Sequence, residues 1–528
     1  MPEHLRALAV ILALTLPVFW VAQRVLCPAV IDTADFVRRR NLWLGITLAA
    51  FLSHNYWLYL FIATGLMIWG ANPLRERNPI ALFFFLLLAV PPFAGELPGL
   101  GFFKHLFQIN HLRFLALLIL LPAAVRLMQR GDVPGMGRFA ADWFLLGYLA
   151  LLIALNIGAG AAVTDLMRTT FYLFIDTLLL YYVASRSVTR LPDFRNAAAS
   201  LSIAMLVIAP LAMFEFVRHW LLYLALNDAL GLTVPTGTYL ARDSLIRAVG
   251  PSGHSIALGY CMAVGLGLWI VFQGTLSRLA WWAGALMLLG GLVASLSKGP
   301  WVGAAAVALV TAGAGRGAGL RLGKLLLGAG LCLMFVMLTP YGNTVWGFLP
   351  FVGAVDEGSF DYRHRLFEVS LIVIAQNPLL GSASAFSNPI MEQMRQGDGI
   401  IDMVNTYLGI ALSSGVVGLG LFVGVFVCGS WRVVTVLRAT EASSPTIALA
   451  GRALLGCIFG VLIMIAMVSP ISAIPTLYWT LAGITVGFGA LINNFSLANE
   501  SSAVLRQAAQ PVGRRFSGGE AKPKESKV

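Results

Sequence analysis

Long runs of apolar residues recur along this chain from end to end, each roughly 16–25 residues long. A helix needs about 20 such residues to cross the hydrocarbon core of a bilayer. Hydrophobic residues make up 58% of the 528 residues and charged residues only 11%, against about 25% charged in an ordinary globular chain. This excludes a cytosolic enzyme, a secreted disulfide scaffold, a disordered protein and a membrane barrel. The sequence predicts an all-α, polytopic helical membrane protein with about 13–15 transmembrane helices.

The apolar runs give approximate bounds for these helices. We expect them near 5–26, 42–70, 79–94, 112–128, 141–160, 166–185, 197–226, 254–273, 278–297, 300–314, 320–340, 405–430, 446–468 and 471–492. The segment 42–70 is interrupted by Ser53-His54-Asn55 and is either one tilted helix or two short ones. No small-residue cleavage site follows the first run, which predicts a retained helix instead of a removable signal peptide.

Basic residues fall mainly in the short loops between the apolar runs, where they set orientation. Five regions are assigned to the cytoplasm on this basis: the loops with Arg126/Arg130/Arg138, Arg186/Arg190/Arg195, Arg316/Arg321/Lys324 and Arg432/Arg438, and the tail after Asn494. The loops 227–253 and 341–404 then face the opposite side. The net charge of +12 is therefore explained by topology, and nucleic-acid binding is not expected.

Two carboxylates lie at membrane depth, where a charge costs several kcal/mol. Asp176 is in the middle of the run 166–185, and Glu215 precedes Arg218 and His219 at i+3 and i+4, so that these three would share one helix face. These groups either shape a functional cavity or form a self-neutralising pair that holds helices together.

Basic residues in the predicted outer loops oppose the usual charge bias. Arg247 and His254 bracket the turn Arg247-Ala248-Val249-Gly250-Pro251-Ser252-Gly253-His254, whose free backbone N–H groups would suit an anion unless it is a plain capped turn. Lys298 lies in a break between two helices. Arg363 and Arg365, with His364 between them, open an amphipathic run at 366–375 that Asn377-Pro378-Leu379-Leu380-Gly381 ends. Together these cations would hold a diphosphate.

A further polar segment, Asp402-Met403-Val404-Asn405-Thr406-Tyr407-Leu408, enters the next apolar run. Asp402 and Asn405 are candidates for chemistry or simply for capping that helix, and one does not exclude the other. The glycines of the following Ser414-Gly415-Val416-Val417-Gly418-Leu419-Gly420 indicate close helix packing.

The order of these motifs resembles the O-antigen ligase and polymerase superfamily over roughly 245–425: Arg247…Gly250…His254, Ser-Leu-Ser-Lys-Gly, Tyr-Arg-His-Arg-Leu-Phe…Asn-Pro-Leu-Leu-Gly and Asn-Thr-Tyr-Leu…Ser-Gly-Val-Val-Gly-Leu. The resemblance implies a glycosyltransferase of the bacterial inner membrane that uses a glycan on undecaprenyl diphosphate at the periplasmic face, without metal, nucleotide or other cofactor. By position, Arg363 and Arg247 match family arginines that hold the diphosphate.

The chain departs from the family pattern at two positions. Lys298 stands where many members have arginine, and Val404 stands where ligases have a histidine thought to be the base. Because a base must take the proton of the acceptor hydroxyl, we expect Asp402 to replace it, with His254 or His364 as the alternatives. Loss of the histidine favours a polymerase of exopolysaccharide or O-antigen repeats over a ligase to lipid A-core.

The resemblance also orders the rest of the chain. We expect transmembrane helices at 1–240, a catalytic region at 241–430 that includes the loop 341–404, further transmembrane helices at 431–494, and a disordered tail at 495–528. Catalysis is assigned to Asp402 and Arg363, diphosphate binding to Arg247, Lys298, Arg363 and Arg365, other substrate contacts to His254, His364, Asn405 and Tyr407, and cavity shaping to Asp176 and Glu215. Expected partners are the lipid-linked glycan and the bilayer, with a chain-length regulator or export complex as a candidate.

Two other classes of function remain open at this point. A lipid-linked-glycan flippase or solute transporter would use Asp176 and Glu215 as coupling groups, although no repeated halves or paired broken helices are evident. A scaffold for an export complex would not require the outer arginines.

Overall fold

The computed structural model describes residues 2–72, 76–98, 105–232, 241–242, 245–339, 357–396 and 399–491. The predicted tail at 495–528 lies outside them. The elements of the first half are α1 (Glu3–Leu26), α2 (Thr33–Leu52), α3 (Tyr56–Gly70), α4 (Pro79–Leu86), β1 (Ala94–Pro98), β2 (His105–Asn110), α5 (His111–Leu115), η1 (Ala116–Leu120), α6 (Leu121–Gln129), α7 (Ala140–Gly158), α8 (Val163–Leu173), η2 (Phe174–Leu179), α9 (Leu180–Ser187), α10 (Leu191–Arg218) and α11 (Leu226–Leu230).

The second half carries the rest of the elements. They are β3 (Ala241–Arg242), β4 (Leu245–Ile246), η3 (Gly250–Ser252), α12 (Ser255–Trp269), η4 (Ile270–Phe272), α13 (Arg278–Ala294), α14 (Lys298–Gly313), α15 (Ala318–Met337), α17 (Glu357–Gln376), η5 (Ala385–Ser387), α18 (Pro389–Glu392), α19 (Thr406–Thr440), α20 (Pro445–Ile465) and α21 (Ala473–Phe488). The strands form two small antiparallel hairpins, β1 with β2 and β3 with β4.

Helices dominate the fold, as the apolar runs predict. Eight described helices are long and apolar enough to cross a membrane, and three more, α3, α13 and α21, are apolar but shorter. Each predicted segment contains helix, so the all-α polytopic class is confirmed. The segment 42–70 contains two helices: α2 ends at Leu52, and Asn55 begins α3 by accepting a hydrogen bond from the Trp57 N–H at 2.7 Å.

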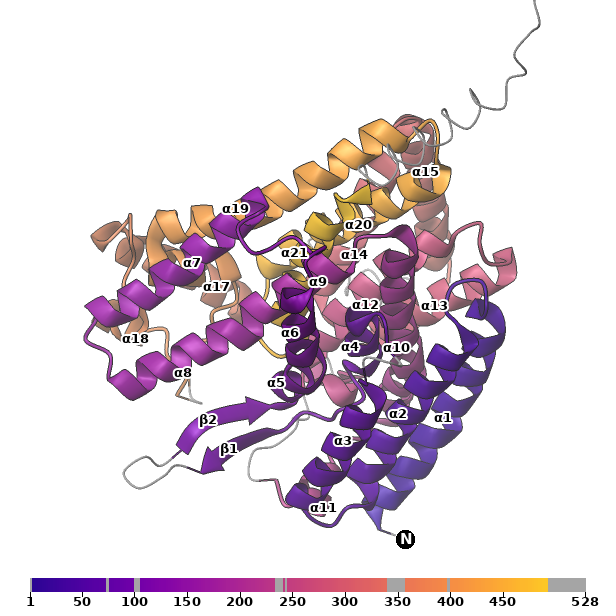
Figure 1. Ribbon diagram of the computed structural model, residues 1–528, viewed down its shortest axis with the longest axis horizontal. Helices are drawn as coiled ribbons and strands as arrows, with labels where there is room; N and C mark the ends of the chain where they lie inside the picture. The colour runs from indigo at the N-terminus through magenta and orange to yellow at the C-terminus, as the bar shows by residue number, and fades with distance from the viewer. Residues whose placement is uncertain are drawn as a thin grey trace, which may run out of the picture.

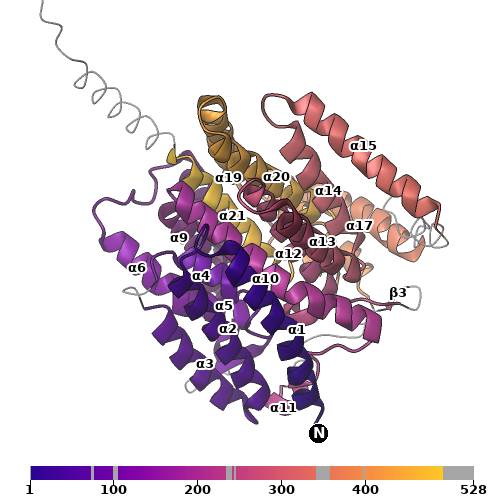
Figure 2. The ribbon, with the colours of Figure 1, turned by 90° about the vertical axis from the view of Figure 1, so that its right-hand side faces the viewer.

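The core forms around α10, α12 and α20, which are largely buried, while α1, α2 and α3 lie together at one side and α19 crosses the opposite edge (Figure 1). Glycines allow the closest approach between α14 and α20. A Cβ atom at Gly460 would lie 2.9 Å from the Gly303 carbonyl oxygen, which agrees with small residues at membrane helix contacts. In contrast, α15 packs along α14 at the periphery and has no buried residue among those described (Figure 2).

The predicted common helix face of Glu215, Arg218 and His219 is wrong for His219, and Glu215 and Arg218 differ in burial. Helix α10 ends at Arg218, and His219 adopts a left-handed conformation with φ of 54° that turns the chain away from the helix. Arg218 is exposed, whereas Glu215 is fully buried and accepts hydrogen bonds from backbone N–H groups. Neutralisation of Glu215 by its helical neighbour is therefore not what holds this region.

Helix α19 is broken at Gly415, and the segment after α17 fills the break. Gly415 has φ of 64° and ψ of −168°, a region that only glycine visits readily. The carbonyl groups of Pro378 and Leu379 accept hydrogen bonds from the N–H groups of Val416 and Val417, at 2.9 and 3.1 Å. The two sequence motifs around Asn377 and Ser414 are thus one structural unit, in which a loop supplies the bonds that the interrupted helix lacks.

Substitution of Gly415 by alanine should destabilise the protein by about 2 kcal/mol or more, because backbone strain adds to a clash. The new Cβ would lie 2.2 Å from the Leu379 carbonyl oxygen. Unfolding in detergent, followed by intrinsic fluorescence, measures the change. Gly420→Ala is the matched control, since nothing lies within 4 Å of its Cβ position on the same helix; equal effects of the two substitutions would contradict the argument.

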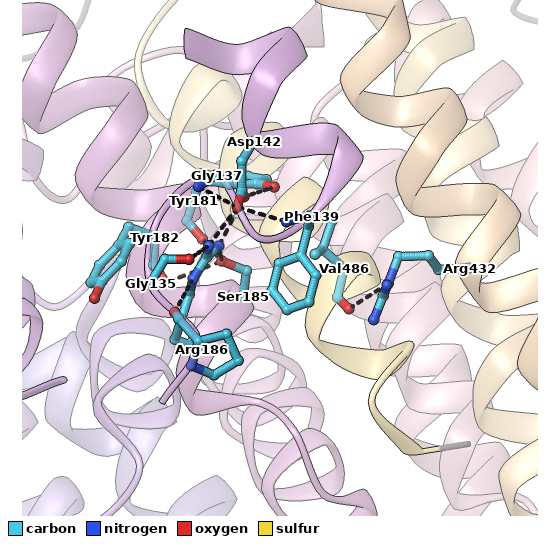
Figure 3. Close-up of polar contacts among 11 residues, drawn as sticks. Gly135, Gly137, Phe139, Asp142, Tyr181, Tyr182, Ser185, Arg186, Arg432 and Val486 are labelled. Carbon is cyan, nitrogen blue, oxygen red and sulfur yellow. Dashed lines mark hydrogen bonds and ion pairs between the residues drawn. The ribbon is translucent and has the colours of Figure 1, made fainter. Parts of the chain in front are cut away.

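A cluster around one buried ion pair joins four helices, α7, α9, α19 and α21, at the end of the bundle predicted to face the cytoplasm (Figure 3). Asp142 at the start of α7 lies 2.6 Å from Arg186 at the end of α9, and both side chains are fully buried. The Tyr181 hydroxyl donates to the same carboxylate at 2.8 Å. The guanidinium groups of Arg186 and Arg432 each lie over the Phe139 ring, 4.8 and 4.7 Å from its centroid, and Arg432 also donates to the last turn of α21. These contacts between helices indicate that the cluster stabilises the fold.

Removal of one partner from this pair leaves an uncompensated buried charge. We expect Asp142→Ala to lower the free energy of unfolding by roughly 3–5 kcal/mol, measured by thermal unfolding of the purified protein. Asp132→Ala provides the comparison, because both side chains of the Arg130–Asp132 pair are exposed and exposed ion pairs contribute little to the free energy of unfolding. A loss in Asp142→Ala no larger than in Asp132→Ala would show that the cluster does not hold the helices.

Candidate functional site

The turn before α12 is fixed by a carboxylate from α10. Glu215 accepts hydrogen bonds from the N–H groups of Val249 and Gly250, at 3.0 and 2.8 Å, and from that of Leu222 at 3.0 Å. Gly250 and Gly253 adopt positive φ of 52° and 74°, which glycine permits at no steric cost. Because Glu215 occupies the two turn amides, they are not available to the anion that the sequence suggests there.

Arg247, which opens this turn, is bonded to the break between α13 and α14. Its guanidinium donates to the Ser297 hydroxyl at 2.8 Å and to the Ser295 carbonyl at 3.4 Å. The N–H of Ala248 also donates to the Ala294 carbonyl at 3.0 Å. Lys298 follows Ser297 directly as the first residue of α14 and is half-buried. The structure thus brings Arg247 to the segment that carries Lys298, although fifty residues separate them.

His254 caps α12 and lies in the electrostatic field of two other predicted site residues. Its Nδ1 accepts a hydrogen bond from the Ile256 N–H at 3.2 Å. Burial lowers the pKa of His254, Arg247 lowers it further, and Asp402 acts in the opposite direction. The imidazole is therefore neutral at pH 7. With Nδ1 accepting, the proton of the neutral ring is on Nε2, which makes His254 a donor to an incoming group and a poor base.

Asp402 lies where the segment before α19 meets the connection between α20 and α21. Its Oδ1 accepts a hydrogen bond from the Ser469 hydroxyl at 2.5 Å, and its backbone carbonyl accepts one from the Tyr362 hydroxyl at 3.1 Å. Three residues after Ser469, the Ser472 hydroxyl donates to the Ser252 carbonyl at 2.7 Å. These contacts place Asp402 beside the 247–254 turn and bind it to the start of α17.

Helix α17 presents its basic residues to solvent next to this junction. Tyr362 anchors the helix to Asp402, while Leu366 and Val369 are buried against the surrounding loops. Arg363, His364 and Arg365 are exposed, and His364 lies 3.6 Å from Glu368 on the same helix. The predicted amphipathic helix is therefore present, and it begins earlier than the run 366–375.

Three other candidates have structural partners. Asn405 caps α19 by accepting from the N–H groups of Tyr407 and Leu408, at 2.9 and 3.3 Å. The Tyr407 hydroxyl donates to the Leu462 carbonyl in α20 at 2.8 Å. Asp176 pairs with Arg113 at 2.8 Å in a different part of the bundle, between α5 and η2. These contacts favour bracing roles for all three.

The main cluster thus consists of Arg247, His254 and Asp402, with Lys298 and the start of α17 at its border. Sequence reasoning did not identify Ser297, Tyr362, Ser469 or Arg113 as partners. Ser297 and Tyr362 carried a signal, since they lie inside the Ser-Leu-Ser-Lys-Gly and Tyr-Arg-His-Arg motifs. Among the described residues, no group of three or more His, Cys, Asp or Glu side chains is placed to hold a metal ion.

Fold and site define a multi-pass helical membrane protein with a polar cluster at one end of the bundle. Residues 283–423 match the family model described as O-antigen ligase. The resemblance to the O-antigen ligase superfamily is thereby confirmed over this segment, which contains Lys298, Arg363, Arg365 and Asp402 and excludes Arg247 and His254. No curated protein matches the chain. The family match supports a membrane role in glycosyl transfer or ligation.

The lowered pKa of His254 predicts acid sensitivity. Because the unfolded chain binds this proton more readily than the folded one, the stability contributed by neutral His254 is present above about pH 6.5 and is lost as pH falls toward the lower folded-state pKa. His254→Asn keeps a capping group for α12 and does not titrate. We expect the variant to lose less stability than the parent between about pH 6.5 and 5, measured by thermal unfolding.

The exposed His54 provides the control for this measurement. His54→Asn should leave the pH dependence of unfolding as in the parent protein. Identical pH profiles of the parent and His254→Asn would refute the assignment of acid sensitivity to the capping imidazole.

Proposed function

We propose that this protein transfers a glycan from undecaprenyl diphosphate to a sugar hydroxyl at the periplasmic face of the bacterial inner membrane, and thereby polymerises exopolysaccharide or O-antigen repeats. The proposal is carried by one observation: hydrogen bonds bring four separate segments together. Arg247 bonds Ser297 beside Lys298, the loop with Ser469 and Ser472 bonds both Asp402 and the 247–254 turn, and the Asp402 carbonyl accepts from Tyr362 of α17. The family match over 283–423 supports the class of reaction.

The cations act on the diphosphate. In the transfer, the acceptor oxygen forms a bond to the anomeric carbon, while the bond from that carbon to the diphosphate oxygen breaks. Negative charge grows on the diphosphate as it leaves, so Arg363, Arg365, Arg247 and Lys298 accelerate the step if their contacts tighten then. Arg363 and Arg365 are exposed on α17, where a lipid-linked donor has access to them.

Asp402 is the proposed base and His254 a donor. The Asp402 carboxylate takes the proton from the acceptor hydroxyl. Ser469 donates a hydrogen bond to Oδ1 of this carboxylate, which leaves Oδ2 to accept the proton. His254, with its proton on Nε2, orients the acceptor oxygen or the diphosphate. Displacement by a single attack inverts the anomeric carbon. This arrangement accounts for a site in which Val404 replaces the histidine of ligases.

Ligation to a lipid A-core acceptor is the second candidate, because the matching family is described as O-antigen ligase. The two reactions share donor, leaving group and base, and differ only in the acceptor. A polymerase forms a ladder of lengthening glycans on the diphosphate lipid, whereas a ligase forms a single product on the added lipid A-core.

An in vitro transfer assay tests the proposal. Purified protein in lipid is given undecaprenyl-diphosphate oligosaccharide without nucleotide or added metal, and products are separated by gel. We expect a product ladder from the parent, and a decrease in rate of about 100-fold or more in Arg363→Ala and Asp402→Asn, the size expected for loss of charge stabilisation or of a base.

Arg395→Ala is the matched control, since Arg395 is an exposed arginine after α18 that pairs with Glu392; it should retain the parent rate. Movement of labelled donor between leaflets without any product would refute glycosyl transfer and make the protein a flippase. Full activity in Arg363→Ala would contradict the proposed role of Arg363 in binding the diphosphate.

A further inference from the structure

A polar pocket lies at the far end of α17 from the proposed site. Its volume is about 270 Å³, near the lower end of the ~300–1,000 Å³ of small-molecule sites. Amide and hydroxyl side chains line it, from Gln376, Asn377, Ser382, Ser384, Ser387 and Asn388. Among the described residues of its lining none is charged, so it does not suit a phosphate, a carboxylate or a cation.

The lining combines hydrogen-bonding groups with an apolar floor. Val373, Ala385 and Leu412 are buried beneath the polar rim. The amide of Gln376 accepts from that of Asn388 at 2.9 Å, and the hydroxyls of Ser382 and Ser384 are 3.0 Å apart. The side chains of Asn377 and Ser387 have no hydrogen-bond partner among the described residues. This combination suits neutral sugars, because their hydroxyls bond amides and hydroxyls while their C–H faces pack on apolar atoms.

The pocket is built on the rigid junction where the loop after α17 enters the break in α19. Gly381 bonds to the Asn377 carbonyl at 2.8 Å, and Ser382 donates to the Leu412 carbonyl at 2.9 Å. A Cβ at Gly381 would lie 2.5 Å from the Gly415 nitrogen, so the two backbones are in direct contact. A pocket held in this way is preformed, which reduces the entropy lost on binding.

Helix α17 connects the pocket with the proposed site. Tyr362 bonds Asp402 near its start, and Gln376 lines the pocket at its end, roughly 21 Å away along the helix axis. A glycan of several sugar residues spans that length, whereas a single sugar at the reacting centre does not. The separation matches a site for a distal part of the substrate.

We propose that this pocket binds neutral sugar residues of the glycan at a distance from the reacting bond, and so holds a growing chain on the enzyme. The inference rests on the proposed glycosyl transfer for its purpose, but binding does not require that transfer takes place. A glycan bound in this pocket stays on the protein while successive repeats are added. Without the pocket, polymers are released early and are shorter.

A binding experiment tests the pocket without catalysis. The probe is a set of one- and two-repeat oligosaccharides released from the host's own surface polysaccharide by mild acid, titrated into the full chain in lipid nanodiscs and followed by calorimetry. We expect the double variant Asn377→Ala/Ser387→Ala to bind about tenfold more weakly, as loss of two modest hydrogen bonds predicts. Arg363→Ala and the exposed-amide control Gln273→Ala should bind as the parent does.

A second variant keeps the test decisive if the first unfolds. Ser387→Trp adds bulk at an exposed lining position and should block the pocket with the fold intact. Absence of binding to the parent, or equal binding by parent and blocked variant, overturns the proposal, and so does preferential binding of a neutral peptide in place of the sugars. In the transfer assay, the pocket variants should form shorter products, while Arg363→Ala forms none. Oligosaccharide binding without any transfer would overturn the proposed function and retain the pocket.

Discussion

The hydrogen bonds accepted by the buried Glu215 carboxylate hold together the end of the bundle that carries the polar cluster. Backbone N–H groups at membrane depth have no water to bond, so each interruption of a helix needs an internal partner. Glu215 is the partner of two such segments: it accepts hydrogen bonds from the Leu222 N–H, which follows α10, and from the N–H groups of Val249 and Gly250 in the turn before α12. That turn carries Arg247 and His254, and the position of both donors therefore follows from one carboxylate on a neighbouring helix.

The break in α19 obeys the same constraint with a different partner. Here the carbonyl groups of Pro378 and Leu379, not a charged side chain, accept from the interrupted helix. The loop that follows α17 is thereby fixed to a transmembrane helix at one end, and the Tyr362 contact to Asp402 fixes α17 at the other. Held at both ends, α17 keeps the exposed Arg363 in a fixed position relative to Asp402.

The charged groups divide into two kinds by their burial. Arg39 is buried and donates hydrogen bonds from two guanidinium nitrogens to the Glu76 carboxylate, at 3.0 and 2.8 Å. Arg186 likewise donates from two nitrogens to the Asp142 carboxylate. Within each pair the two charges compensate each other, which explains why charged side chains are found inside an apolar bundle. Arg363 and Arg365 are exposed near the start of α17, and the polar pocket at the end of that helix has no charge among its described lining residues. The two proposals depend on this arrangement, with cations near the start of α17 and neutral polar groups at its end.

The sequence determined the class of protein and the approximate helices, because length and apolarity suffice to define a membrane span. It also indicated the segments that carry the proposed site, since clustered basic residues and ordered glycine motifs are local features. It did not reveal that Glu215 bonds the turn at 249–250, that Asp176 pairs with Arg113, or that the motifs at Asn377 and Ser414 interlock. These are contacts between residues tens of positions apart, and a burial pattern does not specify which helix is the neighbour. The tertiary structure decided them, because only the packed bundle determines which carboxylate or carbonyl reaches each interrupted backbone.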